Sequence, residues 1–215
     1  MHLNAISDKR RMRQLAIVID LDRCIGCLGG CQAACKQEYG IALGPSRSKI
    51  YNIGPTGTFP DLEFYFLPLM CQQCIEPGCV KACPTGACYK CGDDGVVYID
   101  RDMCIGCKSC EKACPYRAII HNKELRVFDK CDLCRSLRAA GEKPACMKNC
   151  SGSAIFFGDV GDPESEISKR LAEAGTCAYS LPDSGVKPAG RYILRSATWQ
   201  DPLPYMDKKG GGRIE

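Results

Sequence analysis

The cysteines of this chain restrict its possible folds more than any other feature. Nineteen of its 215 residues are cysteine, and sixteen of these form four groups that each open with CxxC and close with CxxxC. The groups are Cys24, Cys27, Cys31 and Cys35; Cys71, Cys74, Cys79 and Cys83; Cys104, Cys107, Cys110 and Cys114; and Cys131, Cys134, Cys146 and Cys150. Such a repeat predicts cross-links or bound metal, because the remaining apolar residues make only a thin core.

Group three, CIGCKSCEKACP, matches the bacterial ferredoxin pattern C-x2-C-x2-C-x3-C-P at every position. In that pattern three cysteines bind one [4Fe–4S] cluster, and the fourth binds the other cluster of a pair. Gly26 and Gly106, each inside a CxxC, suit loops whose backbone adopts a positive φ. Pro84 and Pro115 follow the last cysteine of groups two and three and turn the chain out of the loop. The pattern therefore predicts iron–sulfur clusters.

Disulfides and zinc are the alternatives to iron–sulfur clusters. Disulfide-rich secreted proteins usually have an even number of cysteines, whereas the number here is odd. Zinc sites often include histidine, but the two histidines, His2 and His121, lie outside the cysteine groups. Zinc also does not explain the third cysteine or the Cys-Pro endings. Group four, with eleven residues between its CxxC and its third cysteine, most resembles a zinc ribbon.

A coarse reading of secondary structure predicts an α+β fold. Short β-like runs precede the groups: LAIVID (15–20), LEFYFLPLM (62–70), GVVYID (95–100) and LRVFDK (125–130). Helix-compatible residues, KQEY (36–39), follow group one, and the turn GDDG (92–95) separates groups two and three. Each unit therefore has a strand, a cluster loop and a helical turn. Two such units make one ferredoxin-like module, so we expect two interleaved modules that depend on metal to fold.

Groups two and three are joined by a short turn and strand, so we expect them to form an inner module. Groups one and four would then form an outer module around it. Exchange of the fourth cysteine within each module gives four ligand sets. Set 1 is Cys24, Cys27, Cys31 and Cys150; set 2 is Cys71, Cys74, Cys79 and Cys114; set 3 is Cys104, Cys107, Cys110 and Cys83; set 4 is Cys131, Cys134, Cys146 and Cys35.

The predicted boundaries follow from these modules. We expect a basic N-terminal segment (1–13), the first half of the outer module (14–40), a surface insertion rich in Gly, Pro and Ser (41–65), the inner module (66–118), the second half of the outer module (119–160), and an irregular C-terminal tail that faces a partner (161–215).

The order and spacing of the four groups resemble the four-cluster iron–sulfur subunit of molybdopterin oxidoreductases of the dimethyl-sulfoxide-reductase family. The resemblance covers about residues 15–163 and includes FFGDVGDPESEIS after group four. Group one departs from the family, because Leu28, Gly29 and Gly30 place three residues between its second and third cysteines instead of two. Assigning Cys31 as a ligand therefore requires the extra glycine to be absorbed as a bulge.

The resemblance implies an electron-transfer subunit with four [4Fe–4S] clusters that is not an enzyme by itself. It implies a large catalytic subunit with a molybdenum or tungsten bis-molybdopterin guanine dinucleotide centre, and often a membrane anchor or quinone-reactive subunit. Electrons would pass between that centre and a quinone, cytochrome or ferredoxin. A soluble polyferredoxin that serves another redox enzyme is the nearer alternative, and a structural zinc protein is the more distant one. We find no Ser–His–Asp set, P-loop or GxGxxG motif.

Charge and hydropathy exclude other partners. The formal net charge is only +4, and lysines beside the cysteine groups offset thiolate charge, so we expect no nucleic acid. No apolar run approaches the ~20 residues that cross a bilayer. The run LAIVI, after the basic residues 9–13, is too short for a signal peptide. We therefore expect a cytoplasmic protein, or a periplasmic one that is exported together with a signal-bearing partner.

Three cysteines and one tryptophan fall outside these groups. Cys88, Cys91 and Cys177 have no complete ligand pattern, so we expect them to be small buried side chains. Trp199 lies in the tail, where it either anchors a partner or packs within the chain. His121 is expected at the surface, and Lys90 is a candidate for a charge beside a cluster.

Overall fold

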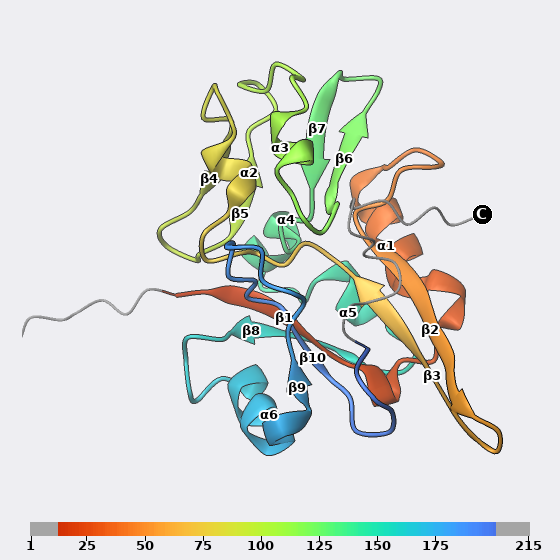
Figure 1. Ribbon diagram of the computed structural model, residues 1–215. Helices are drawn as coiled ribbons and strands as arrows, with labels where there is room; N and C mark the ends of the chain where they lie inside the picture. The colour runs from red at the N-terminus through yellow and green to blue at the C-terminus, as the bar shows by residue number, and fades with distance from the viewer. Residues whose placement is uncertain (1–12, 201–215) are drawn as a thin grey trace, which may run out of the picture.

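The computed structural model describes residues 13–200, which form a mixed α+β fold of short elements (Figure 1). The largest sheet has the strand order β8 (Ile155–Asp159), β1 (Leu15–Asp20), β10 (Arg191–Ile193) and β9 (Ala178–Tyr179). β1 pairs antiparallel with β8 and parallel with β10. Every residue of β1 is buried, as expected for an almost continuous apolar run inside a sheet. The predicted α+β class is confirmed.

Helix α6 (Glu166–Ala174) packs against this sheet at the bottom of Figure 1. The hydroxyl of Ser165 caps it by accepting a hydrogen bond from the Ser168 amide at 3.2 Å. Ile167 is fully buried and packs against Val18 of β1 and Phe156 of β8. A 3₁₀ turn, η3 (Gly175–Cys177), leads from α6 to β9.

The inner module lies at the top of Figure 1. Strands β4 (Cys88–Lys90) and β5 (Val97–Ile99) pair antiparallel, and helices α2 (Gly78–Lys81) and α3 (Ser109–Lys112) contact each other. A second hairpin, β6 (Ile119–Asn122) with β7 (Val127–Lys130), leads from this module to group four. Groups two and three are therefore close in space as well as in sequence.

The outer module brings together the two ends of the cysteine-rich region. Group one contains the 3₁₀ turns η1 (Leu21–Arg23) and η2 (Cys27–Gly29) and helix α1 (Gly30–Tyr39). Group four contains helices α4 (Arg135–Ala139) and α5 (Ala145–Lys148). Helix α1 packs against α5, so the first and last cysteine groups meet as the interleaved arrangement requires.

The predicted strands before the groups are present, but the helices begin earlier than expected. The predicted helical residues after group one (36–39) are only the end of α1, which starts at Gly30 and includes Cys31 and Cys35. In the other groups the third cysteine likewise lies in a helix: Cys79 in α2, Cys110 in α3 and Cys146 in α5. A helix that carries a ligand fixes the direction of its thiol more firmly than a loop does.

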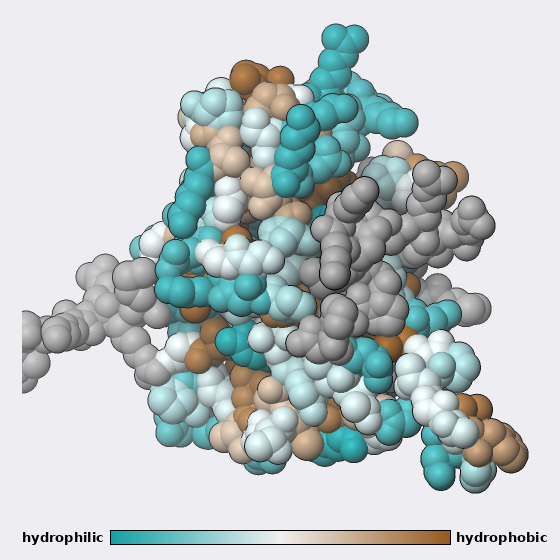
Figure 2. Space-filling model, in the orientation of Figure 1, coloured by the Kyte–Doolittle hydropathy of each residue, from teal (hydrophilic) through white to brown (hydrophobic). Residues whose placement is uncertain are grey.

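The segment expected to be a surface insertion (41–65) contains an ordered hairpin. Strand β2 (Lys49–Thr58) pairs antiparallel with β3 (Asp61–Leu69), with a bulge between Ile53 and Thr56. The hairpin extends to the lower right of Figure 1, and its tip carries apolar side chains in Figure 2. Phe59 at the tip is 84 % exposed. The strands form despite the Gly and Pro content because the ladder and the buried side chains of β3 outweigh it.

The expectation of an irregular tail over residues 161–215 is wrong for the part that is described. Strand β10 adds to β1 in the main sheet, and the segment before it is fixed to the loop of group two. The Gln72 carbonyl accepts from the amides of Ala189 and Gly190, and the Lys187 carbonyl accepts from Ile75. The short strands β9 and β10 carry too little sequence pattern to be found without their partner strand.

Parts of the predicted terminal segments lie outside the described residues, namely 1–12 of the basic N-terminal segment and 201–215 of the tail. The short apolar run LAIVI belongs to the buried strand β1. Within residues 13–200, each helix is too short or too polar to cross a membrane.

Candidate metal centres

Set 1 surrounds a cavity at the edge of the outer module. The cavity is lined by Cys24, Cys27, Cys31 and Cys150, together with apolar side chains that include Ile19 and Ile155. The Ala154 amide donates a hydrogen bond to Cys150 Sγ at 3.2 Å. Burial, with the charges of the other three thiols, raises the pKa of Cys31 to about 12. The thiols of set 1 are therefore close enough to resist ionising together.

The extra residue in group one is absorbed where helix α1 begins. Gly29 has φ +84°, in the left-handed region, and it forms the N-cap of α1. A Cβ at Gly29 would lie 3.2 Å from Gln32 Oε1. Glycine is the residue that adopts this conformation without strain, so LeuGlyGly reaches Cys31 through a tight left-handed turn. Cys31 itself is buried and lines the set 1 cavity.

Set 4 surrounds a second cavity in the outer module. It is lined by Cys35, Cys131, Cys134 and Cys146, with Tyr39, Arg47 and Asp132 beside them. The Ala145 amide donates to Cys134 Sγ at 3.5 Å. Burial raises the pKa of Cys146 well above its ordinary value, and the charges of Cys131, Cys134 and Cys35 add to this rise. Cys35 reaches this cavity from group one, as the exchange of the fourth cysteine predicts.

Set 3 surrounds a cavity in the inner module. It is lined by Cys83, Cys104, Cys107 and Cys110, and also by Cys88. The Phe128 amide donates to Cys104 Sγ at 3.5 Å, and the Cys88 amide donates to Cys83 Sγ at 3.3 Å. Cys107 is exposed, whereas Cys110 is buried. This cavity is therefore the one whose thiols come nearest to solvent.

Set 2 lies between sets 3 and 4. Burial raises the pKa of Cys74 to about 12, and the charges of Cys71, Cys114 and Cys79 contribute. Burial likewise raises the pKa of Cys114 to about 11, with contributions from Cys71 and Cys79. Cys114 therefore lies within electrostatic reach of the group two thiols, although it belongs to group three in sequence.

The residues of the four sets fit iron–sulfur clusters by their chemistry. Several of the thiols, such as Cys31, Cys74 and Cys146, are buried with a raised pKa, and a bound metal would supply the positive charge that stabilises them as thiolates. Main-chain amides directed at Sγ atoms are a second feature of such sites, because hydrogen bonds to sulfur adjust a cluster's potential. Across residues 13–200, no three metal-ligating side chains converge on the position of a single ion. A zinc site needs its thiolates about 2.3 Å from one ion, whereas the thiols of sets 1, 3 and 4 surround cavities.

Sequence reasoning missed residues that lie between the sets. Cys88 was expected only to be buried, yet its thiol also hydrogen-bonds with Cys79 of set 2. Lys130 is 2 % exposed, and Gln73 is 1 % exposed. Burial lowers the pKa of Lys130, but the charges of Cys71, Cys131 and Cys79 outweigh this and raise it. The sequence showed that Cys88, Lys130 and Gln73 lie inside or beside the cysteine groups, but it did not show that the side chains of Lys130 and Gln73 are buried.

The other residues outside the groups have simpler surroundings. Trp199 stacks on Tyr179 with ring centroids 5.0 Å apart, so it packs within the chain. His121 is partly buried and stacks on Phe128. The Lys90 ammonium donates to the Cys74 carbonyl at 2.8 Å, which places it beside set 2.

Comparison with known proteins identifies the family. A family model described as a 4Fe-4S dicluster domain matches residues 62–160. The chain is 42 % identical over 208 residues to the B subunit of the sulfite dehydrogenase of Allochromatium vinosum, covering 87 % of this chain and 85 % of that one.

Two further relatives are similar over most of their length. The chain is 40 % identical over 173 residues to protein NrfC of Escherichia coli K12, covering 80 % of this chain and 77 % of NrfC. It is 35 % identical over 191 residues to the B subunit of the tetrathionate reductase of Salmonella typhimurium, covering 87 % of this chain and 75 % of the relative. The chain therefore belongs to the iron–sulfur subunits of dimethyl-sulfoxide-reductase-family enzymes, which transfer electrons through [4Fe–4S] clusters.

Proposed function

We propose that this chain carries four [4Fe–4S] clusters, one on each cysteine set, and relays single electrons between a large molybdopterin-containing catalytic subunit and a quinone, cytochrome or ferredoxin. Each cluster, when bound, accepts and releases one electron. The observation that carries the proposal is the convergence of distant cysteines. In each set three cysteines of one group meet the last cysteine of another, and sets 1, 3 and 4 line cavities.

Electrostatic interactions between thiols of different sets support a linear relay in the order 1, 4, 2, 3. Cys31 of set 1 acts electrostatically on Cys146 of set 4. Cys71 of set 2 acts on Cys131 of set 4, and Cys79 of set 2 acts on Cys110 of set 3. Each set thus has a neighbour within electrostatic reach. An electron that enters at set 1 or set 3 can cross the chain without a mobile carrier.

The terminal sets lie beside partly exposed apolar surface. Near set 3, Ile105 is 67 % exposed, and Met103 and Leu125 are also exposed. Figure 2 shows apolar side chains at the top of the molecule, over the loop that leads to α3. Near set 1, an open groove beside Cys27 is lined by Ile25, Ile50 and Phe66. Exposed apolar surface of this kind fits protein partners, so we assign one partner to each end of the relay.

The chain's own residues hold and shield the clusters. Amides of Phe128, Ala145 and Ala154 donate to ligand sulfurs and stabilise their negative charge. Apolar side chains such as Ile19 and Leu133 line the cavities of sets 1 and 4 and exclude water. The chain therefore supplies geometry, shielding and local charge, while the catalytic subunit supplies the substrate site.

The names of the relatives support the choice of partner. Two of the relatives are B subunits, one of a sulfite dehydrogenase and one of a tetrathionate reductase, which places this kind of chain in multi-subunit enzymes. A membrane anchor or quinone-reactive subunit is the partner that we propose for the other end of the relay.

The test is to purify the complex that contains this chain under anaerobic conditions and to titrate it by EPR. We expect a molybdopterin-containing subunit to co-purify, and four cluster signals from this chain as the potential is lowered. Co-purification with a redox enzyme that lacks molybdopterin would instead support a polyferredoxin. Fewer than four cubane signals from this chain, or zinc in their place, would contradict the proposed four-cluster relay.

A further inference from the structure

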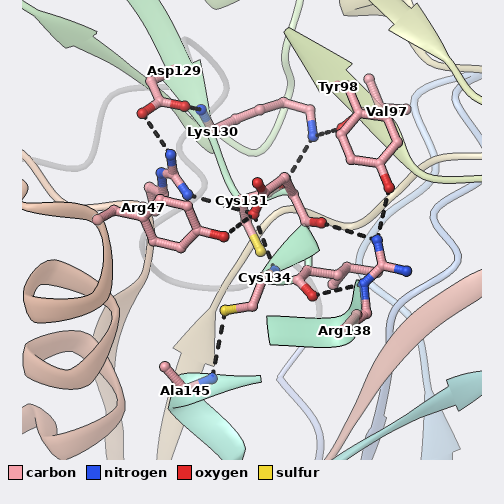
Figure 3. A network of polar contacts seen from close by, with 12 residues as sticks. Arg47, Val97, Tyr98, Asp129, Lys130, Cys131, Cys134, Arg138 and Ala145 are labelled. Carbon is pink, nitrogen blue, oxygen red and sulfur yellow. Dashed lines mark hydrogen bonds and ion pairs between the residues drawn. The ribbon is translucent and has the colours of Figure 1, made fainter. Parts of the chain in front are cut away.

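Lys130 is a buried lysine that has no carboxylate partner among residues 13–200. Its ammonium donates to the main-chain carbonyls of Val97 and Cys131, as Figure 3 shows. The ion pairs formed by residues 13–200 do not include Lys130, whereas the nearby buried Arg47 pairs with Asp129 at 2.6 Å. Buried charges in proteins are ordinarily paired or bound to a metal site. Lys130 therefore needs a negative counter-charge of another kind.

The Lys130 charge lies between two cysteine sets. Its ammonium donates to the carbonyl of Cys131, a set 4 residue, and Gln73, which lies between Cys71 and Cys74 of set 2 in the sequence, donates to the same carbonyl. The ammonium also interacts electrostatically with Cys71 and Cys79 of set 2. Lys130 ends strand β7, directly before Cys131, and its side chain reaches Val97 in β5 of the inner module. Its ammonium therefore lies at the junction of the two modules, where the proposed relay passes from one to the other.

A neutral side chain makes the same connections. Gln73 Nε2 donates to the Cys131 carbonyl at 2.9 Å, and Gln73 Oε1 accepts from the Val97 amide at 2.9 Å. Gln73 and Lys130 thus hold the same two backbone segments together, one without a charge and the other with it. If the junction needed only mechanical support, hydrogen bonds from neutral groups would be sufficient.

We propose that the ammonium of Lys130 is the shared counter-charge of the clusters on sets 2 and 4, and that it raises the reduction potentials of both. A fixed positive charge in a water-poor interior stabilises the state that carries one more electron. Because the charge acts on both sides of the junction, it raises the two potentials together and keeps them close to each other. This inference rests on the proposed four-cluster relay.

The experiment is a redox titration, followed by EPR, of the whole purified complex with the full chain carrying Lys130→Met. We expect the midpoint potentials of two of the four clusters to fall. The expected change is at least tenfold in each one-electron equilibrium, which is about 59 mV. The other two clusters, on the sets farther from Lys130, should shift by clearly less.

Two control variants separate charge from structure. Gln73→Leu removes hydrogen bonds to Val97 and Cys131 without removing a charge, so its potentials should stay close to those of the wild type. Lys148→Met removes a lysine that lies between Cys146 and Cys150 in sequence but is exposed and paired with Glu142. Water screens the Lys148 charge, so this change should also leave the potentials nearly unaltered.

The outcomes are distinguishable. Four clusters in the wild-type complex support the relay, and a lower number there counts against the proposed function itself. With four clusters present, unchanged potentials in Lys130→Met would overturn the proposal for Lys130. The proposal would also be overturned if Gln73→Leu lowered the midpoint potentials as much as Lys130→Met does. If Lys130→Met loses clusters, Lys130→Gln repeats the test with a neutral side chain that can still donate hydrogen bonds. Loss of the junction clusters in both variants would assign Lys130 a structural role and overturn the proposal.

Discussion

Single residues decide whether the cluster loops can form. The positive φ expected for Gly26 and Gly106 is confirmed, with values of 70° and 68°. A Cβ at Gly106 would lie 2.5 Å from the Arg126 carbonyl oxygen, and one at Gly26 would lie 2.6 Å from the Phe66 ring. The CIGC sequence indicated the backbone conformation, but the groups that press against each glycine come from distant segments.

Replacing Gly106 by alanine should destabilise the chain and the cluster of set 3. The left-handed conformation costs a non-glycine residue about 1–2 kcal/mol, and the clash with the Arg126 carbonyl adds to this cost. Gly86→Ala is the matched control, because Gly86 has φ 72° and open space around its Cβ position. Denaturant unfolding and iron content should show a larger loss for Gly106→Ala. Equal losses would mean that backbone strain alone, and not the close approach, matters there.

Asp94 should make stability depend on pH in the acidic range. Burial raises its pKa, but hydrogen bonds from Tyr98 and Val96 and the charge of Arg138 outweigh this and leave the pKa lowered. A lowered pKa in the folded state stabilises the protein above the unfolded value of about 3.9, and this contribution is lost as the pH falls through the folded value. Asp94→Asn should therefore be less stable than the wild type at pH 7, with a gap that narrows towards pH 3.

The control for this prediction is Asp93→Asn, because Asp93 is exposed. Unfolding free energies measured from pH 3 to pH 7 provide the comparison. If the difference in unfolding free energy between Asp94→Asn and the wild type stayed constant over that range, the stabilising role of the Asp94 carboxylate would be contradicted.

At the scale of elements, local pattern predicted some segments and missed others. β1 and β3 were found because each combines an apolar run with flanking turn residues. β9 and β10 have only two and three residues, and they exist because β1 provides a partner edge. Helix α6 was missed as well, although Ser165 and the buried positions of Ile167 and Ala174 are typical of a capped amphipathic helix.

The tail helix should contribute to the stability of the whole chain. Ile167 is fully buried, so Ile167→Ala should lower the free energy of unfolding by about 2–5 kcal/mol. Lys169→Ala is the control on the same helix, where an exposed side chain should matter by no more than about 0.5 kcal/mol. Chemical denaturation of the cluster-loaded protein measures both variants. If Ile167→Ala lowered the unfolding free energy as little as Lys169→Ala, α6 would contribute little to the stability of the chain.

At the scale of the whole molecule, we expect folding to depend on cluster binding. The spacing of the sixteen cysteines predicts two modules and an exchange of the fourth cysteine. In the structure Cys35 and Cys150 each line a cavity with cysteines of the other outer group, and the ligand sets themselves stay a prediction. The proposed linear order of the sets could not be predicted from the sequence. It rests on the packing of α1 against α5 and on the electrostatic interactions of group four with groups one and two.

Removal of the clusters should unfold the modules and leave no stable apo form. Buried thiols whose ligand positions converge from distant segments would lose both their cross-links and their compensating charge. Anaerobic chelation followed by circular dichroism should show loss of secondary structure in parallel with loss of the brown colour. A colourless protein that kept its native spectrum and melting behaviour would contradict this dependence.

The central claim is that each of the four cysteine sets binds a [4Fe–4S] cluster, and the most direct test is to quantify iron and acid-labile sulfide in anaerobically purified, fully loaded chain. The account predicts about sixteen iron and about sixteen sulfide per chain, four of each for every cluster, with negligible zinc. About eight of each would correspond to only two clusters. That result, or stoichiometric zinc, would contradict the account.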